Sequence, residues 1–464
     1  MKNITFEEAR RLISEGESQT HEQRMAAAHE RLRGLVLYAK EHSPYFRNAY
    51  KNIGEKFNLE DLPITTKAGL MDCYDRWPTD SEVTEESVRA YLADVENVSK
   101  SYLGRYTALS TSGTTGAPTP MVRDSYHNTI HGCLLNQRLM RDIDAEKINF
   151  FVSKTAAVIA TDGFVSSYSS ALRMKSRLGE KADNLLILSI LTPIAELVSR
   201  LNSFCPEIIT GYPSVLSVLA REKLEGRLNA TPHFIASSAE KMSRDSYELL
   251  RKAFNCPVLD NYCSTEGGEI AMSCREGHLH LNDDWVLLEP VDDDMKHVAP
   301  GQWSTGALIT DLTNYVQPII RYHVNDCVRF SGQSGCMGEQ DATRPTNPCE
   351  CGSNLPVLEI MGRMGDTICL NGIYLTTPVA HFMLTDIPNI LNWQLIQTKE
   401  NSVELRIIEA YGANRAETAV VSAQKLKAAL RTYGCGEIEV ASSDEEFLKS
   451  PRGGKSPLIV NKVK

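Results

Sequence analysis

Short apolar runs alternate with helix-like segments through the middle of this sequence, and this alternation limits the fold more than any other feature. The apolar runs span residues 148–152, 184–190, 206–212, 233–237 and 257–262. Helix-like segments at 214–226 and 243–255 separate the later runs. Strands that alternate with helices are typical of a partly parallel sheet with helices on its faces. The sequence therefore predicts a large α/β domain.

The two ends of the chain have a different character. Residues 21–43 carry apolar side chains at helical spacing, and a loop with short helices follows them. Near the C-terminus, four short segments predict a small α+β domain of about a hundred residues. These segments are 402–410, 423–434, 436–442 and 457–463. We therefore expect one domain over 1–361 and a second over 362–464.

Composition and charge exclude several classes of protein. With 464 residues, 42% of them hydrophobic and 23% charged, the chain has the composition of a globular protein of two or more domains. Its first residues are acidic where a signal peptide needs an apolar run, and no apolar stretch reaches the roughly 20 residues that span a bilayer. We predict a cytoplasmic protein. The net charge of −10 argues against broad electrostatic binding to nucleic acid or to anionic membranes.

Residues 108–122, ALSTSGTTGAPTPMV, concentrate hydroxyl side chains and glycines between apolar segments. Hydroxyl groups and the free amides of a glycine turn form a concave set of donors that suits phosphate oxygens. The stretch does not match a Walker A loop, because Thr119 stands where a lysine is expected. We predict a phosphate-binding loop, and a flexible surface loop is the alternative interpretation.

Cysteine and histidine side chains form a second group, independent of the phosphate loop. They are Cys274, His278, His280, Cys349 and Cys351. Zinc prefers four thiolate and imidazole ligands, and a Cys-x-Cys-Gly turn can present two thiolates to one ion. Alternation along a strand places the two histidines on the same face, so either could be the ligand. We predict a closed structural zinc site with Cys336 as a substitute ligand, and buried free cysteines are the alternative.

Six motifs follow one another along the chain. They are STSGTTGAPTP, ASSAEKM, DNYCSTEGG, PIIRYHVNDCVRF, MGRMGDTICLNGIYL and SPRGGKSPLI. Together they resemble the motifs of the adenylate-forming, or acyl-CoA synthetase, superfamily, and most of all its phenylacetate–CoA ligase-like branch. In that branch the usual lysine of the phosphate loop is commonly a threonine, as at Thr119. The resemblance covers nearly the whole chain and implies a large N-terminal adenylate-forming domain with a small, mobile C-terminal domain.

The resemblance also implies how ATP is held. The groups expected at the pyrophosphate end are Ser112, Gly113, Thr114, Thr115 and Gly116. The other residues expected at the nucleotide are Ala239 and Glu240 beside the adenine, Tyr262 stacked on it, Asp326 at the ribose hydroxyls and Arg363 at the ribose or phosphate. For zinc, the branch keeps a histidine at the position of His280.

Three residues are expected to carry the chemistry, in which a carboxylic acid reacts with ATP to give an acyl-adenylate and pyrophosphate. Thr265 would donate to the α-phosphate, and Glu266 would ligate Mg²⁺, which prefers carboxylate and phosphate oxygens. Lys455, brought in on the small domain, would stabilise the charge that develops between the two reactants. Each residue alone could be an ordinary surface or core residue, and it is the ordered set that favours an enzyme.

The resemblance favours an aromatic or arylacetic acid as the substrate. The residues expected around it are Phe164, Tyr168, Tyr212, Ala236 and Ser237. Plain core packing is the alternative interpretation of these side chains, because pockets and cores use the same residue types.

CoA is the expected acceptor of the acyl group, and the hinge motif departs from the family at that point. Gly365 precedes Asp366 where an acid or lysine is usual, and glycine widens the allowed backbone dihedral angles. The alternatives are transfer to a carrier-protein thiol or a nitrogen nucleophile in specialised metabolism, or a non-catalytic nucleotide-binding relative. The resemblance further implies a homodimer.

Overall fold

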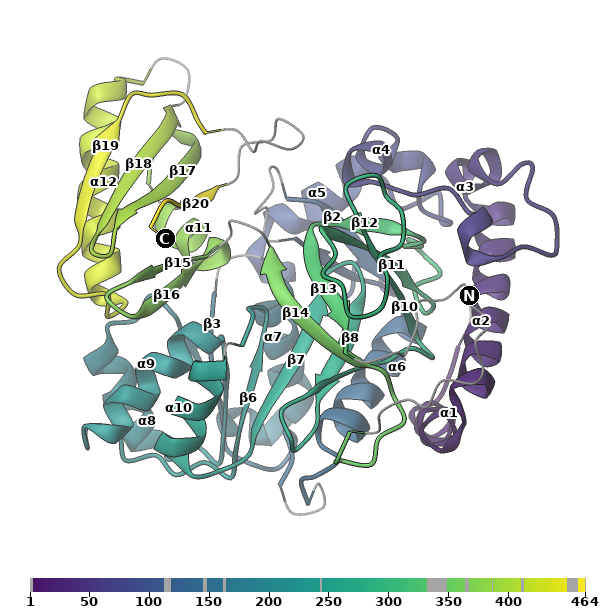
Figure 1. Cartoon of the computed structure of the whole chain (residues 1–464), viewed down its shortest axis with the longest axis horizontal. Helices are drawn as coiled ribbons and strands as arrows, with labels where there is room; N and C mark the ends of the chain where they lie inside the picture. The colour runs from purple at the N-terminus through teal and green to yellow at the C-terminus, as the bar shows by residue number, and fades with distance from the viewer. Residues whose placement is uncertain are drawn as a thin grey trace.

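The computed structural model describes residues 3–111, 118–144, 148–161, 164–242, 244–331, 349–363, 367–385, 387–409, 413–448 and 458–463. Figure 1 shows helices of the N-terminal region along one side, a central sheet with helices against it, and the C-terminal region at one corner. The α/β class predicted from the sequence is confirmed.

Helices dominate the first hundred residues. They are α1 (Phe6–Ser18), α2 (His21–His42), α3 (Pro44–Ala49), α4 (Lys67–Met71) and α5 (Glu85–Ala93). Helix α2 confirms the helix predicted over 21–43. Thr5 and Thr20 begin the first two helices with capping boxes, in which each threonine oxygen accepts a backbone N–H from the first turn.

A nine-stranded sheet forms the body of the protein, in the order β13-β14-β9-β8-β7-β6-β5-β3-β4. Its strands are β3 (Thr155–Ile159), β4 (Leu185–Ser189), β5 (Ile208–Gly211), β6 (Phe234–Ser238), β7 (Val258–Ser264), β8 (Gly268–Ser273), β9 (Leu279–Leu281), β13 (Asp326–Phe330) and β14 (Val357–Arg363). The five strands from β7 to β4 are parallel, and the remaining pairs are antiparallel.

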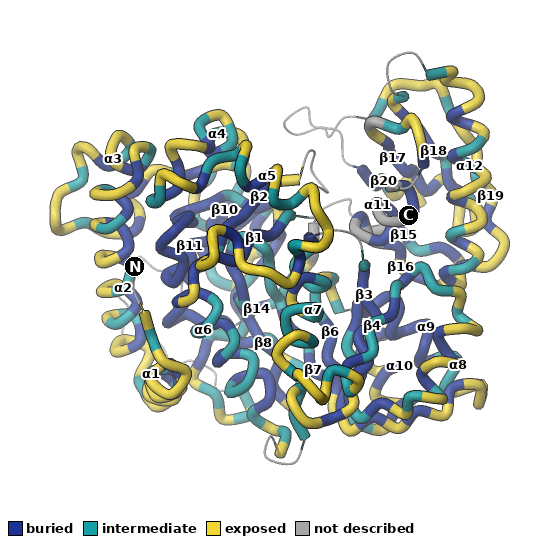
Figure 2. Tube along the Cα trace, turned by 180° about the vertical axis from the view of Figure 1, so that it is seen from behind, coloured by how far each residue is buried: buried dark blue, intermediate teal, exposed yellow. Residues whose placement is uncertain are grey.

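Helices connect the parallel strands, as the alternating pattern predicts. They are α7 (Ser166–Leu178), α8 (Ile194–Phe204), α9 (Pro213–Leu224) and α10 (Arg244–Phe254), and α6 (Ser125–Leu134) precedes β3. Figure 2 shows these strands as mostly buried, with exposed residues on the outer faces of the helices. No helix among the described residues combines the length and the apolar character that crossing a bilayer requires.

Two smaller sheets complete the first part of the chain. Strands β1 (Thr107–Ser110) and β2 (Pro120–Arg123) pair as an antiparallel hairpin. A three-stranded sheet contains β10 (Val286–Val291), β11 (Gly306–Asp311) and β12 (Tyr322–Val324). The hairpin brackets the hydroxyl-rich stretch, so that stretch connects two sheet elements as predicted.

The apolar run at 148–152 is not a strand, and this part of the sequence prediction was wrong. The run forms turns, because Asn149 Oδ1 accepts the N–H of Phe151 at 2.9 Å and its carbonyl accepts the N–H of Ser153 at 3.0 Å. Asparagine side chains commonly organise turns in this way. Phe151 is 47% exposed, and the strand β3 begins only at Thr155.

The C-terminal region has the α+β character predicted for it. Its elements are β15 (Thr367–Leu370), β16 (Ile373–Thr376), α11 (Thr377–Thr385), β17 (Ile390–Lys399), β18 (Ser402–Glu409), α12 (Arg415–Thr432), β19 (Glu439–Ser443) and β20 (Ile459–Asn461). Four of the strands form a mixed sheet in the order β19-β18-β17-β20. The domain boundary after residue 361 remains a prediction.

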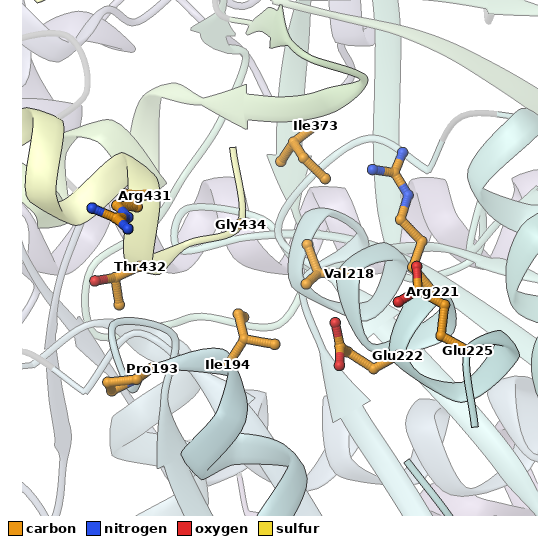
Figure 3. Close-up of a pocket in the computed structure, with 10 residues that line it drawn as sticks. All are labelled: Pro193, Ile194, Val218, Arg221, Glu222, Glu225, Ile373, Arg431, Thr432 and Gly434. Atoms are coloured by element: carbon orange, nitrogen blue, oxygen red, sulfur yellow. The ribbon is translucent and has the colours of Figure 1, made fainter. Parts of the chain in front are cut away.

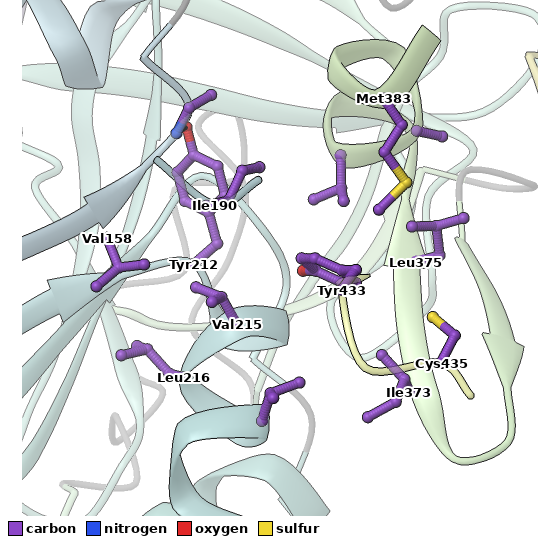
Figure 4. Close-up of a cluster of buried hydrophobic side chains, with 14 of the residues drawn as sticks. Val158, Ile190, Tyr212, Val215, Leu216, Ile373, Leu375, Met383, Tyr433 and Cys435 are labelled. Atoms are coloured by element: carbon purple, nitrogen blue, oxygen red, sulfur yellow. Dashed lines mark hydrogen bonds between the residues drawn. The ribbon is translucent and has the colours of Figure 1, made fainter. Parts of the chain in front are cut away.

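The C-terminal region packs against α9 through a buried contact. Tyr433, which follows α12, is 1% exposed, and its hydroxyl donates to Ser214 Oγ at 2.6 Å. Figure 4 shows its ring between Val215 of α9 and Leu375 of β16. Buried residues of both regions belong to one hydrophobic cluster. Apolar burial therefore stabilises this placement of the C-terminal region.

Candidate functional site

Several predicted site residues follow the carboxyl ends of neighbouring parallel strands. Tyr212 follows β5, Ala239 and Glu240 follow β6, and Thr265 and Glu266 follow β7. The carboxyl ends of parallel strands lie at one edge of a sheet, which is where open α/β sheets bind ligands. The topology therefore brings residues from distant parts of the sequence to a single edge.

Three residues predicted at the nucleotide meet through the sheet. Tyr262 Oη donates to Asp326 Oδ2 at 2.7 Å, which joins β7 to β13. Asp326 is also the register partner of Arg363 on the neighbouring strand β14. The Arg363 side chain lies outside what the structure describes, and its backbone position is described. The expected adenine, ribose and hinge residues are thus neighbours in space.

Thr265 and Glu266 occupy the tight turn between β7 and β8, which are antiparallel. Both residues are half-buried. The N–H of Gly267 donates to Ser264 Oγ at 2.8 Å, which closes the turn on itself. The turn therefore presents a carboxylate and a hydroxyl from a short, fixed segment, as binding of Mg²⁺ and phosphate requires.

The segment after β6 has a strained backbone. Ala239 has a φ angle of +68°, a conformation that residues with a Cβ rarely adopt. Glu240 Oε2 accepts the N–H of Ser214 at 3.1 Å, at the start of α9. The carboxylate therefore caps a helix N-terminus, where negative charge is stabilising. Strained residues of this kind concentrate at ligand sites, which agrees with the predicted place of this segment beside adenine.

The residues expected around the acid occupy adjoining elements. Tyr212 is buried, and its hydroxyl lies 3.0 Å from Ser167 Oγ on α7, next to Tyr168 in the sequence. Ala236 and Ser237 lie on β6 beside β5. Phe164 is buried, with its ring centroid 6.0 Å from that of Tyr91.

Ser237 lies beside an acid that the sequence analysis did not single out. Its hydroxyl donates to Asp260 Oδ1 at 2.5 Å. Burial raises the pKa of Asp260 to about 6, although the Ser237 hydroxyl and a backbone N–H act in the opposite direction. A carboxyl group of β7 therefore lies beside Ser237 at the end of β6.

Several predicted residues lie outside the described part of the chain. They are Ser112, Gly113, Thr114, Thr115, Gly116, Cys336, Gly365, Asp366 and Lys455. The two ends of the predicted phosphate loop are described, and they are joined. The N–H of Thr111 donates to the Thr119 carbonyl at 3.1 Å, and the N–H of Thr119 donates to Thr111 Oγ1 at 2.9 Å. Thr119 therefore helps to close the base of the loop.

The four predicted zinc ligands come together, with their ligand atoms within 4.8 Å of one another. They are Cys274, His280, Cys349 and Cys351. The Sγ atoms of Cys274 and Cys349 lie 3.7 Å apart, and Cys351 Sγ lies 3.4 Å from His280 Nε2. Two thiolates on tetrahedral zinc, with Zn–S bonds of about 2.3 Å, lie about 3.8 Å apart. The spacing of the cluster suits zinc.

Hydrogen bonds around the cluster prepare its members as ligands. His280 Nδ1 donates to the Leu355 carbonyl at 2.9 Å, so Nε2 keeps the lone pair that faces Cys351. His278 lies outside this group of four, with Nδ1 3.2 Å from Cys349 Sγ. Burial raises the pKa of Cys349 to about 12, so the thiol gives a thiolate readily only beside a cation. The geometry favours His280 over His278.

The cysteine and histidine cluster lies away from the Thr265 and Glu266 turn. Cys274 follows the end of β8, whereas the turn precedes its beginning. Cys349 and Cys351 lie in the segment that leads into β14. A cation there would join β8, β9 and β14 at the opposite end of β8 from the turn, which is a structural position.

An open cavity of about 540 Å³ lies between α8, α9 and the C-terminal region (Figure 3). The residues that line it are Pro193, Ile194, Val218, Arg221, Glu222, Glu225, Ile373, Arg431, Thr432 and Gly434. None of these described residues belongs to the predicted site. Among them, Arg221 donates to the Gly372 carbonyl at 2.8 Å and so contributes to the contact between the two regions.

Comparison with known proteins supports the relationship that the motifs indicated. Phenylacetate–coenzyme A ligase of Thermus thermophilus is 21% identical over 405 residues, which are 84% of this chain and 81% of that protein. Protein CapK of Staphylococcus aureus is 22% identical over 275 residues, 58% of this chain, and the match spans only about half, 55%, of CapK. No family model matches the sequence.

The sequence similarity to a phenylacetate–CoA ligase thus extends over most of the chain. Solved structures show the same fold. A 2-hydroxyisobutyryl-CoA ligase in complex with 2-HIB-AMP and CoA superposes with a TM-score of 0.60 at 17% identity, covering 96% of this chain and 91% of that one. The same ligase in its postadenylation state gives a TM-score of 0.55 at 18% identity, covering 94% and 90%. These structures confirm the fold class predicted from the sequence, and the sequence similarity agrees with the superfamily that the motifs indicate.

Two side chains beside the Thr265 and Glu266 turn were missed by the sequence analysis. They are Arg123 of β2 and His131 of α6, and both hydrogen-bond to the backbone around the turn. The His-x-x-x-His spacing of His127 and His131 on one helix face was an available signal. Nothing in the sequence showed that this face meets the β7–β8 turn.

Proposed function

We propose that this protein activates a carboxylic acid with ATP, releasing pyrophosphate and forming an acyl-adenylate, and then transfers the acyl group to CoA. One observation carries the proposal: Tyr262, Asp326 and Arg363, expected at adenine, ribose and hinge, are neighbours beside the Thr265 and Glu266 turn. In an unrelated fold, these three motif residues would not be expected to lie close together.

The chemistry assigns a role to each group. Activation brings two anions together, so the site must compensate charge and align the attack on the α-phosphorus. Glu266 would ligate Mg²⁺, and Thr265 would donate to the α-phosphate. Lys455 would stabilise the charge that develops between the acid and the phosphate. The phosphate loop, 112–116, would hold the departing pyrophosphate.

We propose an aromatic or arylacetic acid as the substrate. The named substrate of the Thermus relative supports this class, whereas the 2-hydroxyisobutyryl ligase carries a small aliphatic acid. Phe164, Tyr168 and Tyr212 would supply aromatic contacts to the acid near the carboxyl ends of the parallel strands. A panel of aryl, arylacetic and short aliphatic acids compares the two classes directly.

We also propose that the cluster of Cys274, His280, Cys349 and Cys351 holds a structural zinc ion. The 3.7 Å sulfur–sulfur distance and the histidine tautomer support this assignment. Metal analysis of protein purified without chelator tests it. We further propose that residues 362–464 form a mobile domain, that the protein is a cytoplasmic homodimer, and that it has no nucleic-acid or membrane partner.

Exchange of labelled pyrophosphate into ATP tests the adenylation step. The proposal predicts exchange that depends on Mg²⁺ and on an added acid. No exchange with any acid of a broad panel would favour a non-catalytic nucleotide-binding protein. CoA, a carrier protein and simple amines should then be offered to the preformed adenylate, because the proposal predicts that CoA accepts the acyl group fastest.

A further inference from the structure

The turn that carries Thr265 and Glu266 is held on its β7 side by an arginine. Arg123 Nη2 donates to the carbonyl of Thr265 at 2.7 Å and to that of Ser264 at 3.1 Å. Arg123 is the last residue of β2, the strand that leaves the phosphate loop. One side chain therefore connects the outgoing arm of the phosphate loop to the turn.

The β8 side of the same turn is held by a histidine. His131 Nδ1 accepts the N–H of Glu269 at 2.8 Å. Its ring also lies against Gly268, where a Cβ would come within 2.4 Å of His131 Cε1. Gly268 has a φ angle of +62°, which favours glycine as well. The ring and the turn backbone are thus in direct contact.

The orientation of His131 is itself fixed by buried groups. Its Nε2 lies 3.1 Å from Thr313 Oγ1 and 3.7 Å from Asp311 Oδ1. Asp311 Oδ2 accepts from His127 Nδ1 at 2.9 Å, and the two histidine rings are 4.1 Å apart. Burial lowers the pKa of His127 to about 3, helped by His131, so the His127 ring packs as a neutral group. Asp311 therefore anchors a rigid network behind the turn.

A metal ion is the competing explanation for His127, His131 and Asp311, because their ligand atoms lie within 4.8 Å of one another. The hydrogen bonds of His131 argue against it. A neutral imidazole has one N–H and one lone pair, and the lone pair on Nδ1 is used by the N–H of Glu269. Nε2 then carries the proton and has no lone pair for a cation. The cluster is a hydrogen-bond network that supports the turn.

We propose that Arg123 and His131 are positioning residues that hold the Thr265–Gly267 turn so that the Glu266 carboxylate can meet Mg²⁺ on ATP. This inference rests on the proposed function. Arg123 holds the β7 side of the turn and His131 holds its β8 side, so loss of either lets the carboxylate move relative to the phosphates. A shift of about 1 Å at a reacting centre can reduce a rate by about a hundredfold. Neither side chain touches the substrate in this account.

The variants R123M and H131L each remove the hydrogen bonds of that side chain to the turn and keep much of the side-chain volume. H131N is the conservative variant, because asparagine Oδ1 replaces Nδ1 as an acceptor for the Glu269 N–H. R31M is the matched control: Arg31 also donates to a backbone carbonyl, that of Asp284, at 3.0 Å, in another part of the fold. Thermal unfolding shows how far each variant is destabilised.

Two quantities are measured for each protein: the Kd of ATP with Mg²⁺ and with EDTA, and the Mg²⁺ dependence of acid-driven pyrophosphate exchange. We expect R123M and H131L to weaken Mg²⁺-dependent ATP binding about tenfold and to raise the Mg²⁺ concentration for half-maximal exchange, with binding in EDTA unchanged. H131N should recover part of the loss, and R31M should match the wild type.

Unchanged Mg²⁺ dependence in folded R123M and H131L would overturn the inference while leaving the proposed function intact. An equal effect in R31M would also overturn it, because the cause would then be general destabilisation. A wild-type protein that shows neither exchange nor Mg²⁺-dependent ATP binding would overturn the proposed function and this inference with it.

Discussion

Tyr262 Oη donates to Asp326 Oδ2 at 2.7 Å, and this bond joins the strand that leads into the Thr265 and Glu266 turn to the strand that carries the expected ribose acid. Asp326 is 8% exposed, so its carboxylate is nearly enclosed, and the tyrosine hydroxyl orients it. If Asp326 accepts hydrogen bonds from ribose, the phenol determines which oxygen is available.

The Tyr262–Asp326 bond predicts a binding effect for the variant Y262F. The ring remains for adenine, but Asp326 loses a donor worth about 0.5–1.5 kcal/mol. We expect the KM for ATP to rise a few-fold with little change in kcat, measured by pyrophosphate exchange at varied ATP. The measurement is repeated with dATP, which lacks the 2′-hydroxyl. If Y262F raises the KM for ATP and for dATP by the same factor, the bond acts through the 3′-side of the ribose. An unchanged KM for ATP in Y262F would show that the bond does not contribute to binding.

The cysteine and histidine cluster predicts a dependence of stability on metal. Structural zinc sites contribute directly to folding stability. We expect one zinc ion per chain and a lower Tm for C351S, which loses both the ion and the Ser353 N–H contact to Cys351 Sγ. C205S is a suitable control, because Cys205 is exposed and lies outside the cluster. A wild-type protein that contains no zinc, together with a Tm of C351S equal to that of the wild type, would contradict the assignment.

A buried ion pair connects the N-terminal half to the β9–β10 connection. Arg138 is 1% exposed, and its guanidinium donates to Asp284 at 2.7 and 2.8 Å. Glu17 Oε1 also lies 3.4 Å from Arg138 Nε, but Glu17 is 37% exposed, so Asp284 is the buried partner of the guanidinium. Removing the buried partner of a buried charge costs about 3–5 kcal/mol. We expect D284N to lower the free energy of unfolding by about this amount, measured in urea. The double variant R138M/D284N should recover part of the loss, and no recovery would show that the pair does not act as a unit.

His127 predicts how stability depends on pH. Its pKa is lowered to about 3 in the folded protein by burial, whereas an unfolded histidine titrates near 6.5. Between these values the unfolded chain binds the proton and the folded one does not, so folding stability falls as the pH falls from about 6.5 toward 3. The slope from this group is at most about 1.4 kcal/mol per pH unit. Urea unfolding at pH 5 and pH 7.5 should show a smaller difference for H127Q than for the wild type. Equal differences in both proteins would contradict this assignment.

Much of the architecture could be predicted from the sequence because the relevant signals are local. Helical spacing located α2, and apolar runs located strands such as β5 and β6. The run at 148–152 misled the prediction, because the Asn149 side chain organises a turn that hydrophobicity alone does not reveal. Packing of the C-terminal region through Tyr433 also depends on a tertiary contact that has no sequence pattern.

The candidate site also combines residues that the sequence identifies with residues that only tertiary contacts identify. Motif residues such as Tyr262 and Asp326 could be named in advance, and the structure adds the hydrogen bond between them. Asp260, Arg123 and His131 were not named, because each acts through partners from distant strands. His278 and His280 could not be separated by strand alternation, and the Leu355 carbonyl is what distinguishes them in three dimensions.

Acid-dependent exchange of labelled pyrophosphate into ATP, compared between the wild type and the variant K455A, tests the central claim most directly. Lys455 is expected to act on charge in the transition state, so its loss should suppress exchange strongly while ATP binding and thermal unfolding stay near the wild-type values. We predict that the wild type exchanges pyrophosphate with at least one aromatic or arylacetic acid, and that K455A suppresses this exchange. A K455A protein that exchanges as fast as the wild type, or a folded wild type that exchanges with no acid, would contradict the account.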